Sequence, residues 1–343
     1  MRGVTLLGSA ALALAMLASP VALPAQPAGG ATTPAVAACD RACLTKAMTG
    51  FLDALVSRDP AKANLAPNVR YTEDGVELPV GEGLWGTATG LGRYRHDFAD
   101  PVTGNAAVFT IVDERGHKSI LSARVKVADG RITEAEVIVS RAGVMGGGMG
   151  DAGIRALETA GAPEALWTQT VPPAERLSRE ELRRIANQYF VGLEKNDGKG
   201  DYPFSDDCER LEGGLPTTNR TEPLGPAGGG YGQELMRMGC KAQFEQGYYR
   251  WLDRIRNRRF VLIDPERGVV FSFVFFDHSG TIPEVTLRNG QTVKVAITQP
   301  FSWELAEAFK ITDGKIRRIE AAMKQAPYGM GPNWPEDSER SGR

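Results

Sequence analysis

The sequence predicts an α+β protein in which one unit, a helix followed by antiparallel strands, occurs twice. Apolar residues recur at helical spacing between Leu44 and Val56, and again between Leu182 and Leu193. After each predicted helix, short apolar runs alternate with turn residues, which is typical of strands joined in hairpins. Each half also ends on a similar turn, Asp129-Gly130 and Asp313-Gly314, followed by a basic residue, an isoleucine and a last predicted strand.

The composition excludes some classes of function. The 343 residues carry 40 Lys and Arg against 42 Asp and Glu, a formal net charge of −2. A balance this close to neutral provides no field for holding a nucleic acid or an anionic membrane, so we expect neither as a partner. Hydrophobic residues make up 42% of the chain, which is typical of folded domains, and the length predicts two of them.

Residues 1–37 have the pattern of a signal peptide and leader. Arg2 precedes an apolar run, Val4–Ala18, that is too short to span a bilayer. A Pro- and Ala-rich stretch then ends at Ala35–Ala37, an Ala-x-Ala cleavage site. We therefore expect an exported protein, periplasmic or secreted, with no membrane span. Lipid anchoring at Cys39 is an alternative that the sequence leaves open.

Four cysteines fit an exported protein, because oxidising compartments favour disulfides. Four residues allow three pairings, and we favour Cys208–Cys240 and Cys39–Cys43. The second pair is one helical turn apart, which is within bridging distance. Neither pair has the spacing of a redox or zinc motif, so both are interpreted as structural.

Residues 38–141 are expected to form the first domain. Its helix ends at Asp59-Pro60, where proline stops the helical pattern. Tyr94–Pro101 is interpreted as a short helical segment, followed by two strands from Phe109 to Val127 and the last strand after Asp129.

Residues 142–176 read as a linker, and 177–330 as the second domain. Ser178 and Glu181 form a capping box for its first helix, and Cys240–Asn257 is interpreted as another helix. Aligning Phe109 with Phe260 predicts that the second copy carries an insertion, placed at 279–302. Residues 331–343 are expected to be a disordered tail.

Six segments give the chain a resemblance to known proteins. They are Cys39–Cys43, Asn68–Leu78, Gly81–Trp85, Phe98–Pro101, Arg267–His278 and Ala326–Met330. Together with the repeated helix, acidic turn segment and hairpins, they resemble a poorly characterised family of secreted proteins known from fungi and some bacteria. The arrangement also looks like the nuclear-transport-factor-like and SnoaL-like superfamily, in tandem. This resemblance implies two cone-shaped α+β barrel domains, each with helices packed on a curved antiparallel sheet.

The superfamily resemblance implies several chemistries. The superfamily includes cofactor-independent dehydratases, isomerases, cyclases, epoxide hydrolases and carbon–carbon lyases. It also includes members that only bind a ligand or partner. Its enzymes place a His, Asp or Tyr in an apolar cone. Because one fold supports all of these, the fold does not choose among them.

The candidate catalytic residues are His96, Asp100, Tyr71 and His278. An imidazole beside a carboxylate suits proton transfer near neutral pH, so His96 is a candidate base oriented by Asp100 or Asp97. Tyr71 could donate to a developing oxyanion, and His278 ends the most apolar predicted strand. Plainer interpretations also exist. His96 could be an exposed helical histidine, with Asp100 capping a turn. Tyr71 could lie on a solvated edge, and His278 could be a turn histidine.

Candidate substrate-binding residues are polar or aromatic side chains near these positions, although core packing explains the aromatic ones equally well. They are Glu73, Trp85, Gln243, Tyr248 and Trp303. We expect no metal, because the three histidines lack ligand spacing, and no cofactor, because Gly148–Gly153 is not part of a βαβ unit.

These observations favour an exported, cofactor-independent lyase or isomerase that acts on a small apolar or aromatic molecule. The alternative is a non-catalytic protein of the same fold that binds a small molecule or a partner. In either case we expect a monomer whose two domains pack as a pseudo-dimer.

Overall fold

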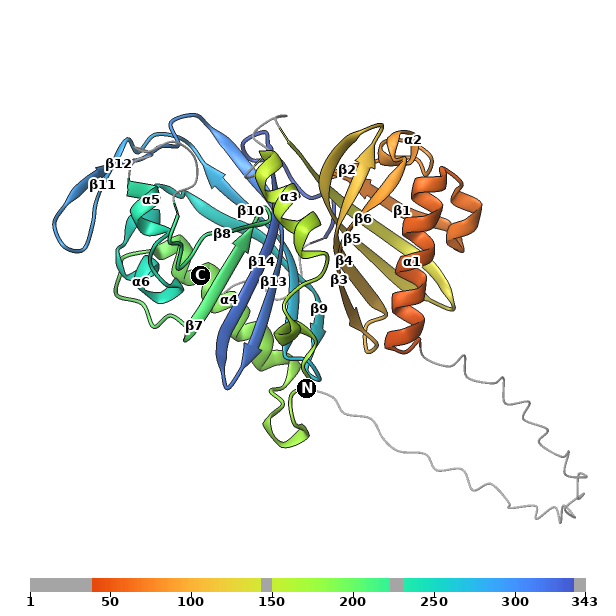
Figure 1. Ribbon diagram of the computed structural model, residues 1–343, viewed down its shortest axis with the longest axis horizontal. Helices are drawn as coiled ribbons and strands as arrows, with labels where there is room; N and C mark the ends of the chain where they lie inside the picture. Colours follow the sequence, from red (N-terminus) through yellow and green to blue (C-terminus); the bar gives the residue numbers. More distant parts are fainter. Residues whose placement is uncertain (1–38, 143–149, 223–230, 336–343) are drawn as a thin grey trace, which may run out of the picture. The chain divides into compact units, whose positions relative to one another are not determined.

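A computed structural model describes residues 39–142, 150–222 and 231–335, which belong to one compact unit of the chain. They form two six-stranded sheets, each with packed helices, and a separate two-stranded hairpin (Figure 1). The α+β fold class with two curved sheets is therefore confirmed. No helix among these residues is long and apolar enough to cross a membrane.

The first half contains one long helix and the first sheet. Its elements are α1 (Arg41–Ser57), η1 (Pro60–Ala63), β1 (Leu65–Glu73), β2 (Val76–Glu77), α2 (Leu84–Thr87), β3 (Gly90–Asp100), β4 (Asn105–Glu114), β5 (His117–Ala128) and β6 (Arg131–Arg141). The connecting elements are α3 (Gly150–Ala160), η2 (Ala165–Thr168) and η3 (Pro173–Glu175). The second half comprises α4 (Arg179–Lys195), β7 (Phe204–Glu212), β8 (Leu215–Pro216), α5 (Tyr231–Leu235), α6 (Cys240–Glu245), η4 (Tyr248–Trp251), β9 (Arg254–Asp264), β10 (Val269–His278), β11 (Glu284–Thr286), β12 (Thr292–Lys294), β13 (Phe301–Thr312) and β14 (Lys315–Ala326).

The two long helices are fixed by caps and by an apolar face. Asp40 accepts a hydrogen bond from the Cys43 amide at the start of α1, and Ser178 accepts one from Glu181 at the start of α4. The apolar residues of each helix are buried against the sheet of their own half. Both favoured disulfides, Cys39–Cys43 and Cys208–Cys240, are confirmed.

The two sheets have the same topology. Their strand orders are β2-β1-β6-β5-β4-β3 and β8-β7-β14-β13-β10-β9. The sequence predicted antiparallel pairing throughout, but β1 pairs with β6, and β7 with β14, in parallel. These strands lie at opposite ends of each unit in the chain, so the connection between them is long enough to allow parallel pairing.

Two predicted helical segments are different in the structure. Tyr94–Pro101 is not helical, because residues up to Asp100 form β3 and pair with β4. The predicted helix Cys240–Asn257 ends at Glu245, and Gly247 follows it with φ 69, a conformation that stops a helix. In the first segment sheet pairing outweighs the local helical pattern, and in the second the chain continues as η4 before β9 begins at Arg254.

The strand registers also revise the internal repeat. Asp100 ends β3 as Asp264 ends β9, so β4 corresponds to β10 and not, as the alignment on Phe109 and Phe260 predicted, to β9. The insertion between β10 and β13 is therefore shorter than that alignment made it. A second insertion, which the sequence did not predict, lies between β8 and β9 and contains α5, α6 and η4.

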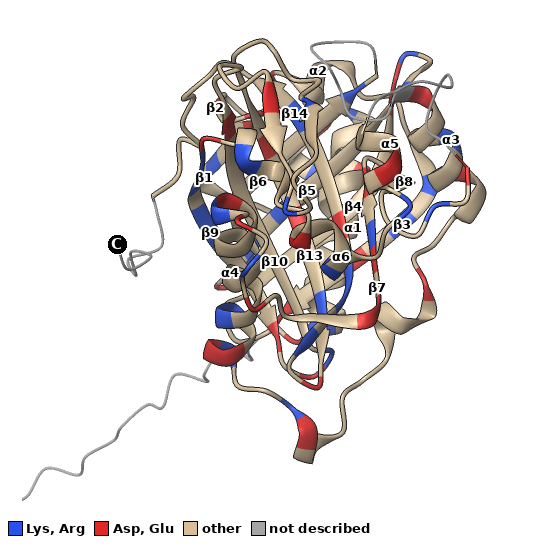
Figure 2. Ribbon diagram, turned by 90° about the vertical axis from the view of Figure 1, so that its left-hand side faces the viewer, with Lys and Arg blue, Asp and Glu red and all other residues tan. Residues whose placement is uncertain are grey.

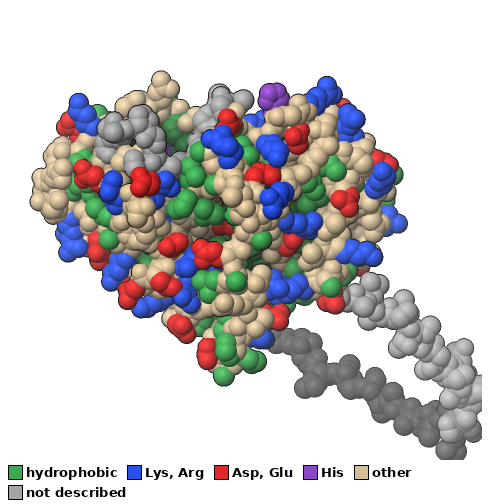
Figure 3. Space-filling view, viewed as in Figure 1, with side chains coloured by type: hydrophobic (Ala, Val, Ile, Leu, Met, Phe, Trp, Pro, Cys, Tyr) green, Lys and Arg blue, Asp and Glu red, His purple; other side chains and the backbone are tan. Residues whose placement is uncertain are grey.

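The two sheets pack against each other through one apolar cluster. Phe98 and Phe109 of the first sheet meet Phe271 of the second at ring distances of 5.2 Å. Figure 1 shows the sheets facing each other, with α1 and α4 on their outer sides. Elsewhere charged side chains of both signs are interspersed on the visible face (Figure 3), in keeping with the near-neutral net charge.

Ion pairs at the rim of this interface are reciprocal. Arg41, the first residue of α1, contacts Asp264 of the second half at 2.8 Å. Arg179, the first residue of α4, contacts Asp100 of the first half at 2.6 Å. Matching residues thus contact each other in both directions, as in the interface of a twofold-symmetric dimer.

Replacing Arg179 with alanine is expected to lower the free energy of unfolding by about 3 kcal/mol, because Asp100 is buried and would lose its cation. Arg184→Ala on the same helix is the matched control, since its pair with Glu181 is exposed and contributes about 0.5 kcal/mol or less. Denaturant unfolding followed by circular dichroism measures both. Equal losses in the two variants would contradict a central role for the Asp100 pair.

Candidate functional site

A pocket of about 210 Å³ lies inside the second half. Its polar end is formed from α4, β7, β13 and η4, by Tyr189, Arg210, Glu212, Tyr249 and Glu307. Its apolar walls include Tyr248, Trp251, Phe276 and Trp303. A concave, largely apolar space with a few convergent polar groups is the usual form of a small-molecule site.

Strand β7 supplies the fixed charges of the pocket. Side chains two residues apart on a strand share a face, so Cys208, Arg210 and Glu212 all point to the same side of β7. Arg210 Nε lies 3.5 Å from Glu212 Oε1, and the Arg210 side chain is only 5% exposed. This ion pair places a buried cation and an acid side by side at the polar end.

The Cys208–Cys240 disulfide ties this strand to the helix that orients the arginine. Gln243, one turn after Cys240, donates from Nε2 to the carbonyls of Thr217 and Leu235. Its Oε1 accepts a hydrogen bond of 3.1 Å from the Tyr249 hydroxyl, which in turn accepts one from Arg210 Nη2. The predicted ligand contact Gln243 therefore lies behind the pocket and holds Tyr249 in place.

Glu307 brings a second acid to the polar end from β13. Its side chain is buried, the Tyr189 hydroxyl bonds to it, and its Oε2 has no hydrogen-bond partner among the described residues. Burial raises the pKa of Glu307 to about 8, and the charge of Glu212 adds to this effect, whereas Arg210 and the Tyr189 bond oppose it. The carboxyl is therefore mainly neutral at pH 7 and can donate a proton.

His278 lines the same pocket at its other end. Its ring stacks between Trp251 and Phe301, and within the described structure its Nδ1 has no hydrogen-bond partner. Burial lowers its pKa to about 4, so the ring is neutral at pH 7. On the paired strand β13, Phe301 opposite His278 is six residues from Glu307, or about 20 Å. His278 and Glu307 therefore do not act on the same atom.

The pocket walls depend on segments that have no counterpart among the described residues of the first half. Leu235, Tyr248, Tyr249 and Trp251 all lie in the insertion between β8 and β9. Leu287 and Val293 of the later insertion pack on Tyr248 and Leu235 from outside. The two insertions therefore support each other and enclose the polar end.

In the first half the corresponding space is filled by side chains. Trp85, on α2, is 1% exposed and lies 5.5 Å from the Phe51 ring and 6.3 Å from the Tyr71 ring. The registers place Tyr71 where the second half has Arg210, Glu73 where it has Glu212, and Ala123 where it has Glu307. The first half thus keeps one of the two acids and has a tyrosine in place of the arginine.

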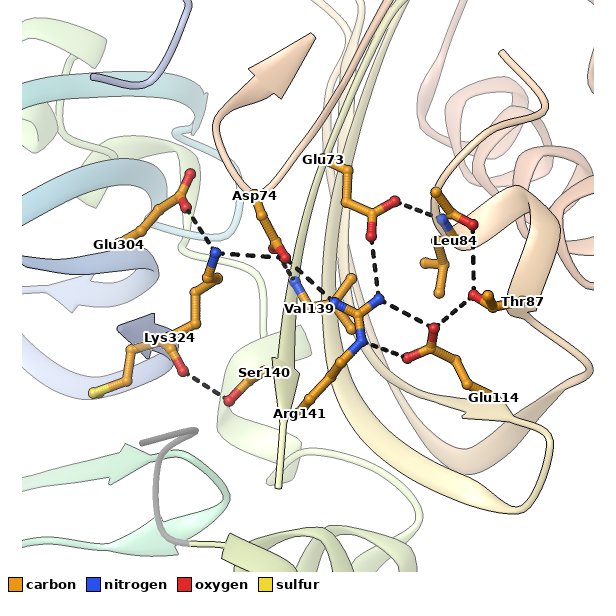
Figure 4. Close-up of polar contacts among 12 residues, drawn as sticks. Glu73, Asp74, Leu84, Thr87, Glu114, Val139, Ser140, Arg141, Glu304 and Lys324 are labelled. Carbon is orange, nitrogen blue, oxygen red and sulfur yellow. Dashed lines mark hydrogen bonds and ion pairs between the residues drawn. The ribbon is translucent and has the colours of Figure 1, made fainter. Parts of the chain in front are cut away.

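Glu73 belongs instead to a polar network that joins the two halves (Figure 4). It accepts hydrogen bonds from the Tyr71 hydroxyl at 3.0 Å, the Leu84 amide at 2.6 Å and Arg141 Nη2 at 3.1 Å. Arg141 also contacts Asp74, and Asp74 contacts Lys324 of the second half at 3.5 Å. Lys324 lies 3.9 Å from Glu304, a buried acid whose pKa burial raises to about 8.

The structure separates His96 from Asp100. His96 Nδ1 lies 2.7 Å from Glu320 Oε2 in the interface between the halves, with the Trp167 ring 4.8 Å away. Asp100 bonds Arg179 and the Ile263 amide instead. His96 pairs with Phe109 on β4 as Arg259 pairs with Phe273 on β10, and Arg259 contacts Glu136, the counterpart of Glu320. His96 thus occupies the position of an interface cation.

Sequence reasoning placed His278, Tyr248 and Trp303 in a ligand site, and the structure brings these three to one pocket. The sequence patterns did not identify Arg210, Glu212 or Glu307 as site residues. One signal was present, because Glu307 is a lone acid in the apolar run Leu305–Phe309. In the described ranges no group of three His, Cys, Asp or Glu side chains could hold a metal ion.

Comparisons with known proteins extend this description. The model of a family described as a domain of unknown function (DUF8021) matches residues 175–323, which include β7, β13 and the whole polar end of the pocket. The chain has no significant match among curated proteins.

Solved structures are similar to parts of the chain. A de novo designed protein with a curved β-sheet is 18% identical over 29% of this chain and 87% of its own, with a TM-score of 0.24. An NTF2-like protein of unknown function from Cytophaga hutchinsonii ATCC 33406 is 13% identical over 28% of this chain and 88% of its own, with a TM-score of 0.23. Each similarity extends over one part of the chain and concerns the fold alone.

Replacing His96 with glutamine is expected to lower the free energy of unfolding by about 1–3 kcal/mol, because the buried Glu320 loses one of its partners. Ligand binding in the pocket should not change. His117→Gln, at an exposed hairpin tip, is the control that should affect neither property. Thermal unfolding with and without a ligand measures both. Full stability together with lost turnover in the His96 variant would instead support a catalytic role for His96.

Proposed function

We propose that the second half is a cofactor-independent lyase or isomerase that transfers protons on a small, largely apolar or aromatic molecule. The observation that carries the proposal is the geometry of Glu307. A carboxyl oxygen without a hydrogen-bond partner among the described residues lies in the wall of the pocket, beside an Arg210–Glu212 ion pair. A buried polar atom of this kind is costly unless a ligand completes its hydrogen bonding.

The two acids are suited to opposite roles. Glu307, which is mainly neutral at pH 7, would donate its proton to an oxygen of the substrate. Glu212, held as an ion pair by Arg210, would accept a proton from carbon. In a dehydration Glu212 would take that proton and Glu307 would protonate the departing hydroxyl, giving an alkene and water. One acid that donates a proton and another that accepts one are a common arrangement in proton-transfer enzymes.

Arg210 and the aromatic walls would position the substrate. The arginine is held by Tyr249 and Glu212, so its charge is oriented before any ligand binds. Tyr248, Trp251 and Trp303 present ring surfaces to an apolar body. His278, neutral and stacked at the other end, would contact the part of the substrate that does not react.

Glu307→Gln is expected to lower turnover by about 100-fold or more, because glutamine keeps the shape but cannot give up a proton. Glu304→Gln is a matched control, since Glu304 is also buried on β13 but faces the interface network. The substrate is sought by incubating the purified protein with a metabolite mixture and measuring which compounds are depleted. Ligand-induced thermal shift reports binding. Saturable binding without any depletion would support the alternative, a non-catalytic binding protein.

Stability should fall as the pH rises from about 6.5 to 8, because folded Glu307 and Glu304 still hold protons that the unfolded chain has lost above 4.5. Below about 6.5 the slope is opposed by His278, whose pKa falls from 6.5 to about 4 on folding. Each Glu→Gln variant should flatten the dependence in the upper window. Unfolding free energies measured at a series of pH values test this, and an unchanged slope in both variants would contradict it.

A further inference from the structure

A second hollow lies between the two halves, away from the pocket. It is a groove of about 530 Å³, lined from the first half by Thr103, Arg124, Lys126 and Glu134, and from the second by Arg259 and Phe260. Trp334 lies at one end. Figure 2 shows Lys and Arg positions on β1 and β9 on this side of the molecule.

The pseudo-twofold relation of the halves gives this groove a counterpart that is filled. There the segment Glu164–Val171 follows the surface. Glu164 contacts Arg318 at 2.9 Å, and the Gln169 carbonyl accepts a hydrogen bond of 2.8 Å from Lys310 Nζ. The Val171 amide donates to the Glu266 carbonyl at 2.7 Å. A short segment of this chain, the 3-10 turn η2 with its flanking residues, therefore fits the counterpart through both backbone and side-chain contacts.

The open groove contains the same four positions. The registers match Glu134 to Arg318, Lys126 to Lys310 and Arg259 to His96, and the turn residue Thr103 corresponds to Arg267. All four of these first-named residues line the groove. The groove thus has the layout of a surface that elsewhere in the same molecule holds a peptide segment with a 3-10 turn.

Charge distinguishes the open groove from its filled counterpart. Arg124 stands where the filled side has Ala308, and Arg259 where it has His96. Both arginines are 3% exposed and share the acid Glu136, and Arg259 Nε has no hydrogen-bond partner in the part of the chain that the structure describes. Lys126 has Glu134 at 3.4 Å and is partly exposed. Cations outnumber acids in the groove lining, and together with the unpartnered Arg259 Nε they favour carboxylates on the occupant.

Among the residues that the structure describes, Trp334 covers one part of the groove, over Arg70 and Arg124. Its ring lies 4.5 Å from the Arg70 guanidinium and 4.9 Å from that of Arg124, and its Nε1 donates to Thr72 Oγ1 at 2.8 Å. Lys126 and Arg259 line the rest of the groove. In the counterpart, Gln169 contacts Lys310, which matches Lys126, and Trp167 packs on His96, which matches Arg259.

We propose that this groove binds an acidic peptide segment of another protein, in the way that the counterpart groove holds Glu164–Val171 with its 3-10 turn η2. Lys126 donates to a backbone carbonyl or carboxylate of that peptide, and Arg259 and Arg124 hold a second carboxylate. Glu134, which replaces Arg318, selects a basic residue at the end of the peptide that corresponds to Glu164.

The probe for this proposal is a fluorescein-labelled peptide, Lys-Ala-Asp-Trp-Asp-Gln-Asp-Val, which has the length of Glu164–Val171. Fluorescence anisotropy with the full chain should show saturable binding. The same peptide with Asn in place of each Asp should have an affinity at least about tenfold lower. Lys126→Glu should lower the affinity about tenfold. Lys126 is partly exposed, so this variant is expected to fold, which circular dichroism verifies.

Lys62→Glu is the matched control, because Lys62 is an exposed cation on η1, paired with Asp59 and outside the groove lining. It should change the affinity less than about twofold. Equal losses in the Lys62 and Lys126 variants would show non-specific attraction and overturn the proposal, as would the absence of saturable binding. Binding to a variant that ends at Pro335 but not to the full chain would also overturn it, because the chain's own last residues would then be the occupant.

Discussion

The contact between the two sheets is the interaction on which the rest of the structure depends. Each sheet uses one face for this contact and the other for its own helix, so the central strands are buried on both faces. Arg41–Asp264 and Arg179–Asp100 close the interface from both helix starts. Because Asp100 and Asp264 are buried at the ends of their strands, each half needs a cation from the other. The two halves therefore stabilise each other through this interface.

Within this shared frame the two halves have diverged in their interiors. The frame fixes the same places for side chains, but Tyr71 and Ala123 of the first half stand where the second has Arg210 and Glu307. The first interior is closed by Trp85, whereas the second is widened and enclosed by two insertions. A divergence of this kind is possible because the interface uses the opposite faces of the strands, so changes in the pocket do not disturb the contact between the halves.

The sequence predicts what is local and fails where the outcome depends on distant partners. Helical periodicity, the Ser178 cap and the spacing of four cysteines were enough for the fold class, two long helices and both disulfides. His96 and Asp100 looked like a catalytic pair because they are close in the chain, but their partners, Glu320 and Arg179, are 224 and 79 residues away. The same limit applies to β3. Its local sequence was interpreted as helical, and only its pairing with β4 shows that it is a strand. Strand register, which assigned Glu307 to the pocket, cannot be read from periodicity alone.

Glu304 and Glu307 show how one strand can give the same residue type two different roles. Both are buried on β13, and burial raises the pKa of each to about 8, so desolvation alone does not distinguish them. Their surroundings do. Both acids have an Oε2 without a hydrogen-bond partner among the described residues, but Glu304 Oε2 lies 3.9 Å from Lys324 Nζ, and Lys324 also contacts Asp74, so a cation of the interface network stands beside it. Glu307 faces a pocket, beside an arginine already paired with Glu212. The unpartnered Oε2 of Glu307 is destabilising, and because it lies in the pocket wall, a bound ligand can complete its hydrogen bonding and offset that cost. The difference in surroundings, rather than the pKa, is therefore what makes Glu307 the candidate for chemistry and Glu304 part of the interface.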